Sequence, residues 1–495
     1  ILVHIVHNVK LIFFILQLEL FLGIKSMVYC MLHKMNIPEG IFKSYDIRGI
    51  YPDELNEENA VVIIKAIYAH LLESLPKRES LIIAIGRDMR LSSYPLFEKI
   101  SETLISMGAN VIDFGIVPTT SFYYGVFKYK IDAGIMITAS HNTKEYNGLK
   151  IVRLSSSGNI IKIGKSTGMD DIKAKSLSEV DVTSDKVGTI RKQEGVMEEE
   201  VQNSFKMVNN PVLDSFKVVA DPANALGALY IEELYKHIPG ELIKMNFELD
   251  GTFPAHQADP LQFDLYKDLQ KKVVDSDADL GLAPDGDGDR LFFVDENGSM
   301  VPASMITALV AREFLVDNPG EKILADIRNV MTPKAIIEEH GGIYVITKVG
   351  HAFITEKLNE VGGIFAGESS GHYFFRDSGN AESQVPIILT VLKVLTREKK
   401  KLSQIIKKLR RSHESGEINF KVSNAKEILE TLKEKYADGE IDEMDGLAVT
   451  YSGWRFSVRS SNTEPLLRLN VEGLDEDIVR QKKEEIIELI EKVGK

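Results

Sequence analysis

Three stretches of this sequence share one layout, in which an apolar strand runs into a loop and then into a helical pattern. Strands that alternate with helices of this length predict βαβ units and mainly parallel or mixed sheets. The stretches suggest a weak internal repeat, although any α/β chain shows similar openings and chance explains them equally well. The strands and helices are 81–88 with 94–107, 216–221 with 225–237, and 322–326 with 332–340.

A chain of 495 residues is several times the usual domain size, so two to four domains are expected. Residues 173–194 and 397–417 are polar or strongly charged and suit domain boundaries. The turn dipeptide at 297–298 suits a third. We therefore expect four domains, at residues 35–187, 188–298, 299–412 and 413–495.

The composition limits the partners and the compartment. The formal net charge of -14 argues against a nucleic-acid partner, because phosphate backbones need a basic face, so any bound phosphate must be held by local groups. Charged residues make up 27% and apolar residues 44%, which is typical of a globular protein without a stable membrane partner. The single cysteine, Cys30, cannot form an intramolecular disulfide, so we expect a cytoplasmic location.

Residues 1–34 form an apolar N-terminal extension of doubtful status. The run 11–24 is almost wholly apolar, yet a membrane span of about 20 residues would take in Glu19 and a lysine. The extension also lacks the basic start and the small-residue cleavage site of a secretory signal. We expect the natural start near Met35, with a membrane anchor or an extra element as alternatives.

The first chemical motif is TASHNTKEYNGLK at 138–150, directly after an apolar strand at 133–137. Polar turns after buried strands are where α/β proteins expose reactive groups, so Ser140 is a candidate nucleophile. A hydrolase is not indicated, because G-x-S-x-G is absent and the adjacent His141 is poorly placed to act as the base. Taken alone, such a loop is more often a polar turn than a site.

The second motif, DGDGDR at 285–290, joins two apolar strands. Its carboxylates, Asp285, Asp287 and Asp289, alternate with glycines whose tight backbone lets all three converge on one hard cation. An EF-hand loop fits less well, because Arg290 stands at its sixth position instead of glycine and a strand follows. A solvated acidic turn and a calcium-binding scaffold without catalysis are the alternatives.

Two further motifs supply groups that suit sugars and phosphates. GESSGH at 367–372 offers a carboxylate and hydroxyls that match sugar hydroxyls, although a strand-ending turn is the simpler interpretation. RSSNTEP at 459–465 combines a guanidinium fork, hydroxyls and backbone N–H donors, as a phosphate dianion requires. Phosphate binding and a capping loop before the next strand are about equally favoured for it.

Together with KSYDIRGIYP at 43–52 and KVGHAFI at 348–354, these motifs resemble the α-D-phosphohexomutase superfamily, and within it the phosphomannomutase/phosphoglucomutase group. The resemblance covers about Met35 to the C-terminus. It implies an α/β fold of four domains around a central cleft. Three of them would be similar α/β domains with mixed sheets, and the last a smaller C-terminal α+β domain.

The resemblance also implies an activity. Hexose 1-phosphate and hexose 6-phosphate, of mannose, glucose or both, would interconvert through a phosphoserine and a 1,6-bisphosphate intermediate. Phosphoglucosamine mutase and a sugar-phosphate phosphatase are the alternatives. The resemblance implies one Mg²⁺ per active site, glucose or mannose 1,6-bisphosphate as activator, and small-molecule sugar phosphates as partners of a monomer or homodimer.

Site residues follow by carry-over from the family. Ser140 resembles the serine that bears the phosphoryl group, and it joins Asp285, Asp287 and Asp289 as a metal ligand. Glu368 and Ser370 resemble the pair that binds sugar hydroxyls, and Arg459 the clamp on the phosphate that does not react. The other residues carried over as catalytic are Arg48, His141, Lys150, Arg290 and His351. The other residues carried over as substrate-binding are Tyr45, Arg328, His372, Ser461, Asn462 and Thr463.

Three positions depart from the family pattern. Thr143 stands where many members have proline, and Ser369 replaces the methionine that is usual there. Both changes should alter loop stiffness more than chemistry. Arg328 stands where the group often has lysine, and this puts the sugar preference in doubt because the two cations differ in fork geometry.

Overall fold

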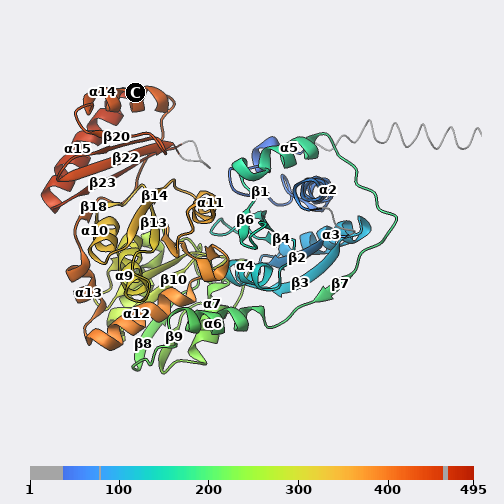
Figure 1. Ribbon diagram of the computed structural model, residues 1–495, viewed down its shortest axis with the longest axis horizontal. Helices are drawn as coiled ribbons and strands as arrows, with labels where there is room; N and C mark the ends of the chain where they lie inside the picture. The colour runs from blue at the N-terminus through green and yellow to red at the C-terminus, as the bar shows by residue number, and fades with distance from the viewer. Residues whose placement is uncertain (1–36, 77–79, 461–465, 495) are drawn as a thin grey trace, which may run out of the picture. The chain divides into compact units, whose positions relative to one another are not determined.

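The structure, a computed structural model, describes residues 37–76, 80–460 and 466–494. The apolar extension expected at 1–34 lies outside these residues. The chain divides into a unit Ile1–Glu39 and a compact unit Gly40–Lys495, to which the sheets and helices below belong. Four sheets follow one another along the compact unit, from blue to red in Figure 1. No helix among the described residues is long and apolar enough to cross a membrane.

The first sheet has seven strands in the order β1-β5-β4-β2-β3-β7, with β6 also paired to β5. Strands β2, β3, β4 and β7 run parallel, whereas β5 is antiparallel to β1, β4 and β6. The strands are β1 (Ile47–Ile50), β2 (Ile82–Arg87), β3 (Asn110–Ile116), β4 (Ala133–Ile137), β5 (Tyr146–Leu154), β6 (Ile160–Lys162) and β7 (Ile190–Lys192). The helices are α2 (Glu57–Ser74), α3 (Ser93–Ser106), α4 (Thr119–Lys128) and α5 (Met169–Leu177).

The second sheet has five strands in the order β12-β11-β10-β8-β9, and the third has five in the order β14-β13-β15-β16-β17. The second comprises β8 (Phe216–Ala220), β9 (Gly240–Lys244), β10 (Leu280–Pro284), β11 (Leu291–Asp295) and β12 (Met300–Val301), with α6 (Val196–Met207), α7 (Gly227–Tyr235) and α8 (Lys267–Asp275). The third comprises β13 (Lys322–Asp326), β14 (Ile343–Thr347), β15 (Phe365–Gly367), β16 (Tyr373–Phe375) and β17 (Ala381–Glu382), with α9 (Ala303–Asp317), α10 (Met331–Glu339), α11 (His351–Val361), α12 (Val385–Glu398) and α13 (Leu402–Leu409).

These three sheets repeat one topology. In each, a first strand lies parallel between a second and a third, and the third continues through an antiparallel hairpin into a fourth and a fifth. The corresponding third strands are β4, β10 and β15. The first sheet adds β1 and β7 to this set. The internal repeat is therefore confirmed, and with it the prediction of three similar α/β domains with mixed sheets.

The fourth sheet is antiparallel, in the order β18-β23-β22-β21-β20 with β19 also paired to β23. The side chain of Asp475 caps the N-terminus of its last helix by accepting from Ile478 N at 2.8 Å. An antiparallel sheet with two helices fits the predicted α+β domain. The elements are β18 (His413–Glu414), β19 (Ile418–Phe420), β20 (Glu440–Asp442), β21 (Leu447–Thr450), β22 (Trp454–Ser460), β23 (Leu467–Gly473), α14 (Ala425–Lys435) and α15 (Glu476–Val493).

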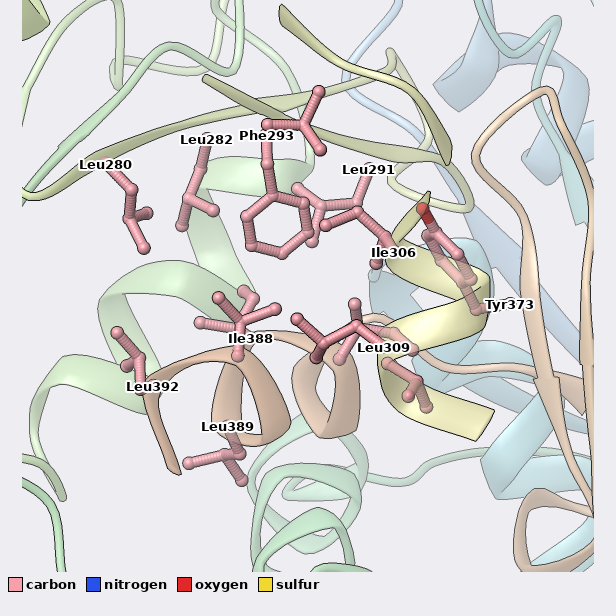
Figure 2. Packing of buried hydrophobic residues seen from close by; sticks show 14 of the residues in the cluster. Leu280, Leu282, Leu291, Phe293, Ile306, Leu309, Tyr373, Ile388, Leu389 and Leu392 are labelled. Carbon is pink, nitrogen blue, oxygen red and sulfur yellow. The ribbon is translucent and has the colours of Figure 1, made fainter. Parts of the chain in front are cut away.

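One apolar core runs through the second and third domains. Leu282 of β10 and Phe293 of β11 belong to the same buried cluster as Leu309 of α9 and Ile388 of α12, and Figure 2 shows their packing. The fourth domain has a separate cluster that includes buried Phe456. Because close-packed cores are stiff, the loops of the second and third domains share one rigid base.

Two strands lie just past the expected domain boundaries. β7 pairs with β3 of the first sheet, although we expect the second domain to begin at residue 188. β12 pairs with β11 of the second sheet, although we expect the third domain to begin at residue 299. Backbone hydrogen bonds tie a strand to its sheet. We therefore propose that the first domain continues through β7 and the second through β12.

Candidate active site

Three of the four chemical motifs occupy corresponding positions in the repeated sheets. The serine loop joins β4 to β5, the aspartate loop joins β10 to β11, and the GESSGH loop joins β15 to β16. Each motif is therefore the turn that follows the third strand of its set. Turns at the carboxyl ends of such strands are where α/β proteins hold ligands.

Ser140 lies in a strained and buried part of its loop. Its φ of 50° falls in the left-handed region, which costs a residue other than glycine about 1–3 kcal/mol and persists only where the surroundings hold the residue there. The N–H of Ser140 donates to Thr138 Oγ1 at 3.0 Å, and Ser140 Oγ donates to Asp285 Oδ2 at 2.8 Å. The hydroxyl of the serine loop therefore meets the aspartate loop of the next domain.

The two loops approach each other closely. A Cβ at Gly286 would lie only 2.4 Å from the carbonyl oxygen of Ser140, so glycine is needed for this approach. The side chains of Asp285, Asp287 and Asp289 are completely buried, and their carboxylate oxygens lie within 4.8 Å of one another. The three carboxylates thus converge, as the alternating pattern predicts.

Positive groups only partly balance these carboxylates. Lys150 Nζ donates to Asp287 Oδ2 and to Asp289 Oδ2, at 2.5 Å in each case. Burial raises the pKa of Asp285 to about 8, and the nearby charges of Asp289 and Asp287 add to the shift. Burial also opposes ionisation of Asp289, but Lys150 and His372 hold the pKa of Asp289 well below its usual value. Asp285 is therefore the least compensated of the three carboxylates, with Arg290 Nε 3.8 Å from its Oδ2.

A divalent cation fits this cluster. Asp287 Oδ1 is buried and has no hydrogen-bond partner within the described part of the chain. Asp287 Oδ2, in contrast, accepts from Lys150 and from Thr119 Oγ1 at 2.7 Å. Buried carboxylate oxygens with an unmatched negative charge are the hard ligands that Mg²⁺ prefers. The donor set therefore suits one magnesium ion.

His141 and Arg48 lie beside Ser140. His141 Nδ1 is 3.2 Å from Ser140 Oγ, although the sequence analysis expects His141 to be poorly placed as a base because it is adjacent to Ser140. The backbone of Ser140 is left-handed at this contact. Burial, then Arg290 and Arg48, hold the pKa of His141 well below its usual value, so the ring is neutral at neutral pH. Arg48 Nη1 donates to Asn142 Oδ1 at 2.6 Å. Ser140 therefore has the neutral imidazole of His141 beside it, and the guanidinium of Arg48 contacts the same loop.

His372 joins the aspartate loop to the GESSGH loop. Its Nε2 is 3.2 Å from Asp289 Oδ1, and its Nδ1 is 2.7 Å from Glu368 Oε2. Burial disfavours the charged ring, but Asp289 and Glu368 raise the pKa of His372 to about 9. At neutral pH the charged ring therefore donates to both carboxylates. Ser370 Oγ lies 3.0 Å from the same Nδ1, so both members of the predicted sugar-binding pair contact His372.

Arg328 and Arg459 meet at one carboxylate. Arg328 donates to both oxygens of Asp326 at 3.1 Å and lies 3.4 Å from Glu368 Oε1. Glu417 Oε2 lies 3.6 Å from Arg328 Nη1 and accepts from Arg459 Nη2 at 3.0 Å. Glu417 therefore links arginines of the third and fourth domains. The predicted site residues Ser461, Asn462 and Thr463 lie outside the described residues.

Tyr45 and His351 come together from two distant motifs. The hydroxyl of Tyr45 donates to the carbonyl oxygen of Val349 at 3.1 Å. Its ring packs edge-on against His351, with ring centres 5.4 Å apart.

Arg290, which follows the aspartates, reaches within 3.8 Å of Asp285 Oδ2 through its Nε.

Arg90 supports the site, although the sequence analysis does not predict it. Its buried guanidinium donates to the backbone of the serine loop and pairs with Asp88 through Nε at 3.0 Å. The carbonyl oxygens that accept from it, at 2.6–3.0 Å, are those of Ser140, Asn142, Thr143 and Tyr146. Arg90 follows Asp88 by two residues, as Arg328 follows Asp326 in the corresponding loop of the third domain. The internal repeat is thus the signal that could have found it.

Family models of phosphoglucomutase/phosphomannomutase match this chain along most of its length. The models for alpha/beta/alpha domains I, II and III match residues 39–177, 199–298 and 302–412. The model for the C-terminal domain matches residues 417–489. The four matches follow the order of the four sheets.

Individual proteins are similar over nearly their whole length. Phosphomannomutase of Methanocaldococcus jannaschii is 35% identical over 458 residues, which is 92% of this chain and 98% of that protein. Phosphomannomutase of Vibrio cholerae is 36% identical over 463 residues, covering 91% and 98%. The crystal structure of a phosphoglucomutase/phosphomannomutase family protein from Burkholderia thailandensis matches with a TM-score of 0.82 at 28% identity, covering 92% and 98%.

Proposed function

This chain belongs to the phosphoglucomutase/phosphomannomutase family, and we propose that it interconverts the 1-phosphates and 6-phosphates of mannose, glucose or both through phospho-Ser140. Family membership makes it a phosphohexomutase, an isomerase that moves a phosphoryl group within a sugar phosphate. The observation that carries the assignment to Ser140 is its hydrogen bond to Asp285, at the rim of three buried carboxylates and Lys150.

The proposed reaction has two half-reactions that mirror each other. In the first, the P–O bond at Ser140 Oγ breaks and a new P–O bond forms to the free hydroxyl of a hexose monophosphate. The proton of that hydroxyl passes to the leaving Ser140 Oγ through a base, for which neutral His141 is a candidate, since it lies 3.2 Å from Ser140 Oγ. The resulting 1,6-bisphosphate turns around, its other phosphoryl group returns to Ser140, and the proton returns to the sugar oxygen.

The residues around Ser140 would act on the charge of the transferring group. Asp285, Asp287 and Asp289, with an oxygen from Ser140 or its phosphate, would hold one Mg²⁺. When bound, this cation neutralises negative charge on the phosphoryl oxygens. Lys150 brings a second, buried positive charge that its ion pairs fix in place. Glucose or mannose 1,6-bisphosphate would act as activator, because it can restore the phosphate on Ser140.

The other predicted residues would hold and orient the sugar phosphate. Arg459, together with Ser461, Asn462 and Thr463, would grip the phosphate that does not react. Glu368 and Ser370 would bind sugar hydroxyls, because a buried carboxylate accepts strong hydrogen bonds from hydroxyl groups. Holding both ends of the substrate places the reacting hydroxyl near the phosphoserine, and such orientation supplies much of the rate in transfers of this kind.

Activity with three substrates tests this proposal. Phosphoryl transfer is measured with the 1-phosphates of mannose, glucose and glucosamine, in Mg²⁺ and with a 1,6-bisphosphate primer. We expect the largest kcat/KM for mannose or glucose, and loss of several orders of magnitude in Ser140→Ala. The exposed Ser156→Ala in the same domain is the matched control and should keep full activity. A preference for glucosamine 1-phosphate would instead indicate phosphoglucosamine mutase.

Phosphate release during turnover separates the mutase from a sugar-phosphate phosphatase. We expect mutase product without free phosphate, because a closed site excludes water from phospho-Ser140. Stoichiometric release of phosphate would establish the phosphatase instead.

The proposal also covers the oligomeric state and the location of the protein. We propose a monomer or homodimer, which light scattering of the eluting protein would measure. We also propose a cytoplasmic location, because the single Cys30 offers no intramolecular disulfide.

A further inference from the structure

A buried ion pair between the first and third domains has no role in the scheme above. Lys162 ends β6 and is 3% exposed, whereas Glu382 ends β17 and is completely buried. Lys162 Nζ donates to Glu382 Oε1, and it lies 4.8 Å and 5.1 Å from the ring centres of Tyr123 and Phe374. Burying two charges is costly, and apolar side chains of similar size could fill the same space. The other contacts of this pair therefore point to a role.

Lys162 also contacts a predicted catalytic residue. Lys162 Nζ lies 3.1 Å from Nδ1 of His351, the first residue of α11. An ammonium group has three N–H donors and no acceptor, so Nδ1 must accept in this contact. A neutral imidazole that accepts at Nδ1 carries its proton on Nε2. The ion pair thus selects one of the two neutral forms of the ring.

The surroundings of His351 favour a neutral ring. Burial, followed by the positive charges of Lys162, Lys150 and His372, holds the pKa of His351 well below its usual value, while Asp289 acts in the opposite direction. The N-terminus of α11 adds a positive potential at the same place. The ring therefore stays uncharged at neutral pH, and the contact with Lys162 decides where its single proton sits.

We propose that Lys162 is a positioning residue that fixes the proton of neutral His351 on Nε2, so that His351 meets the sugar phosphate as a hydrogen-bond donor and not as a base. The inference rests on the proposed function, because the role of His351 toward substrate does. Glu382 holds Lys162 in place as its counter-ion. Asp289, His372 and Glu382 also lie close enough to hold a metal ion, but both nitrogens of charged His372 already donate, to Glu368 and Asp289.

Nitrogen NMR of the full-length protein with isotopically labelled histidine reads the tautomer directly, with His351→Gln assigning the signal. In the wild type we expect the proton of His351 on Nε2 at neutral pH, where Glu382 keeps Lys162 charged although burial lowers the pKa of Lys162. In Lys162→Met we expect a substantial share of the Nδ1–H form, because no ammonium group then meets Nδ1. Lys165→Met removes an exposed lysine nearby and should leave the signal unchanged.

Kinetics provide a second readout. Lys162→Met should lower kcat by about 10²-fold, as expected for the loss of one oriented hydrogen-bond donor to the transferring group, with little change in KM. A wild-type signal with the proton on Nδ1, or an unaltered His351 signal in Lys162→Met, would overturn the inference. A wild type without mutase activity would refute the proposed function, whereas the tautomer would still decide whether Lys162 positions His351.

Lys162→Met leaves Glu382 as an unpaired buried carboxylate, which can prevent folding. The double variant Lys162→Met with Glu382→Gln removes both charges and is expected to fold. Its His351 signal should show the same shift toward Nδ1–H. Retention of the Nε2–H form in the double variant would also overturn the inference.

Discussion

Gly286→Ala should push the aspartate loop away from Ser140. The added Cβ would lie 2.4 Å from the carbonyl oxygen of Ser140 and 3.3 Å from its carbonyl carbon. Real Cβ atoms essentially never approach closer than 3.0 Å, so the two backbones must separate by at least 0.6 Å, the difference of those distances. Both sides of the contact are backbone, and no side-chain rotation relieves it.

The consequence for the site follows from the distance between Ser140 Oγ and Asp285 Oδ2, which is 2.8 Å. A shift of this size would stretch it to about 3.4 Å, beyond the range of an O–H···O hydrogen bond. A misplacement of about 1 Å in a transfer site costs about 10²-fold in rate. We therefore expect kcat to fall by about 10- to 100-fold, with KM little changed because the remote phosphate site is untouched.

Steady-state kinetics at saturating Mg²⁺ measure this effect, together with the Mg²⁺ concentration that gives half-maximal activity. Gly453→Ala is the matched control, because its Cβ would meet nothing closer than Leu474 at 3.8 Å. Thermal melts of both variants establish that they fold. If Gly286→Ala kept kcat and Mg²⁺ dependence within twofold of the control, the close approach of the two loops would not matter for transfer.

Three further predictions concern the predicted phosphate clamp, the metal site and the partly buried Glu414. Arg459→Ala should lower kcat/KM by a factor equivalent to about 3 kcal/mol of transition-state stabilisation, through loss of its charge-assisted contact with the remote phosphate. A sugar that lacks the remote phosphate should be much less affected in a parallel assay, and equal losses would make Arg459 structural. Asp287→Asn should raise the Mg²⁺ concentration needed for activity and lower kcat, since an amide is a poorer ligand; full turnover at limiting Mg²⁺ would contradict this. Burial and then Glu472 raise the pKa of Glu414 from 4.5 to about 8. Because the folded state holds the extra proton, the contribution of Glu414 to stability falls as pH rises through that window. Thermal melts of Glu414→Gln should lack this part of the decline, and an unchanged pH dependence would argue against the shift.

Local patterns predict the elements of this fold well. The apolar strand expected at 133–137 is β4, and DGDGDR joins two strands as expected, because a strand buried on both faces appears as a continuous apolar run. The internal repeat remained undecided at the level of sequence. Strand pairing decides it, since only pairing shows that the three motif loops are corresponding hairpins.

The residues that support the site are not predicted by local patterns. Arg90 meets the carbonyl oxygen of Ser140 from 50 residues away, and Lys162 meets Glu382 from 220 residues away. Such contacts depend on distances in the folded chain that no periodicity encodes. His141 likewise comes within reach of its neighbour beside a left-handed backbone that a serine rarely adopts.

Transfer of a labelled phosphoryl group tests the central claim most directly. The protein is charged with radioactively labelled glucose 1,6-bisphosphate, desalted, digested and mapped, and a second portion is mixed with unlabelled mannose 1-phosphate for a single turnover. We predict one label per chain on Ser140 before mixing, and its passage to a sugar bisphosphate afterwards. Label on another residue, or its release as inorganic phosphate, would contradict the account.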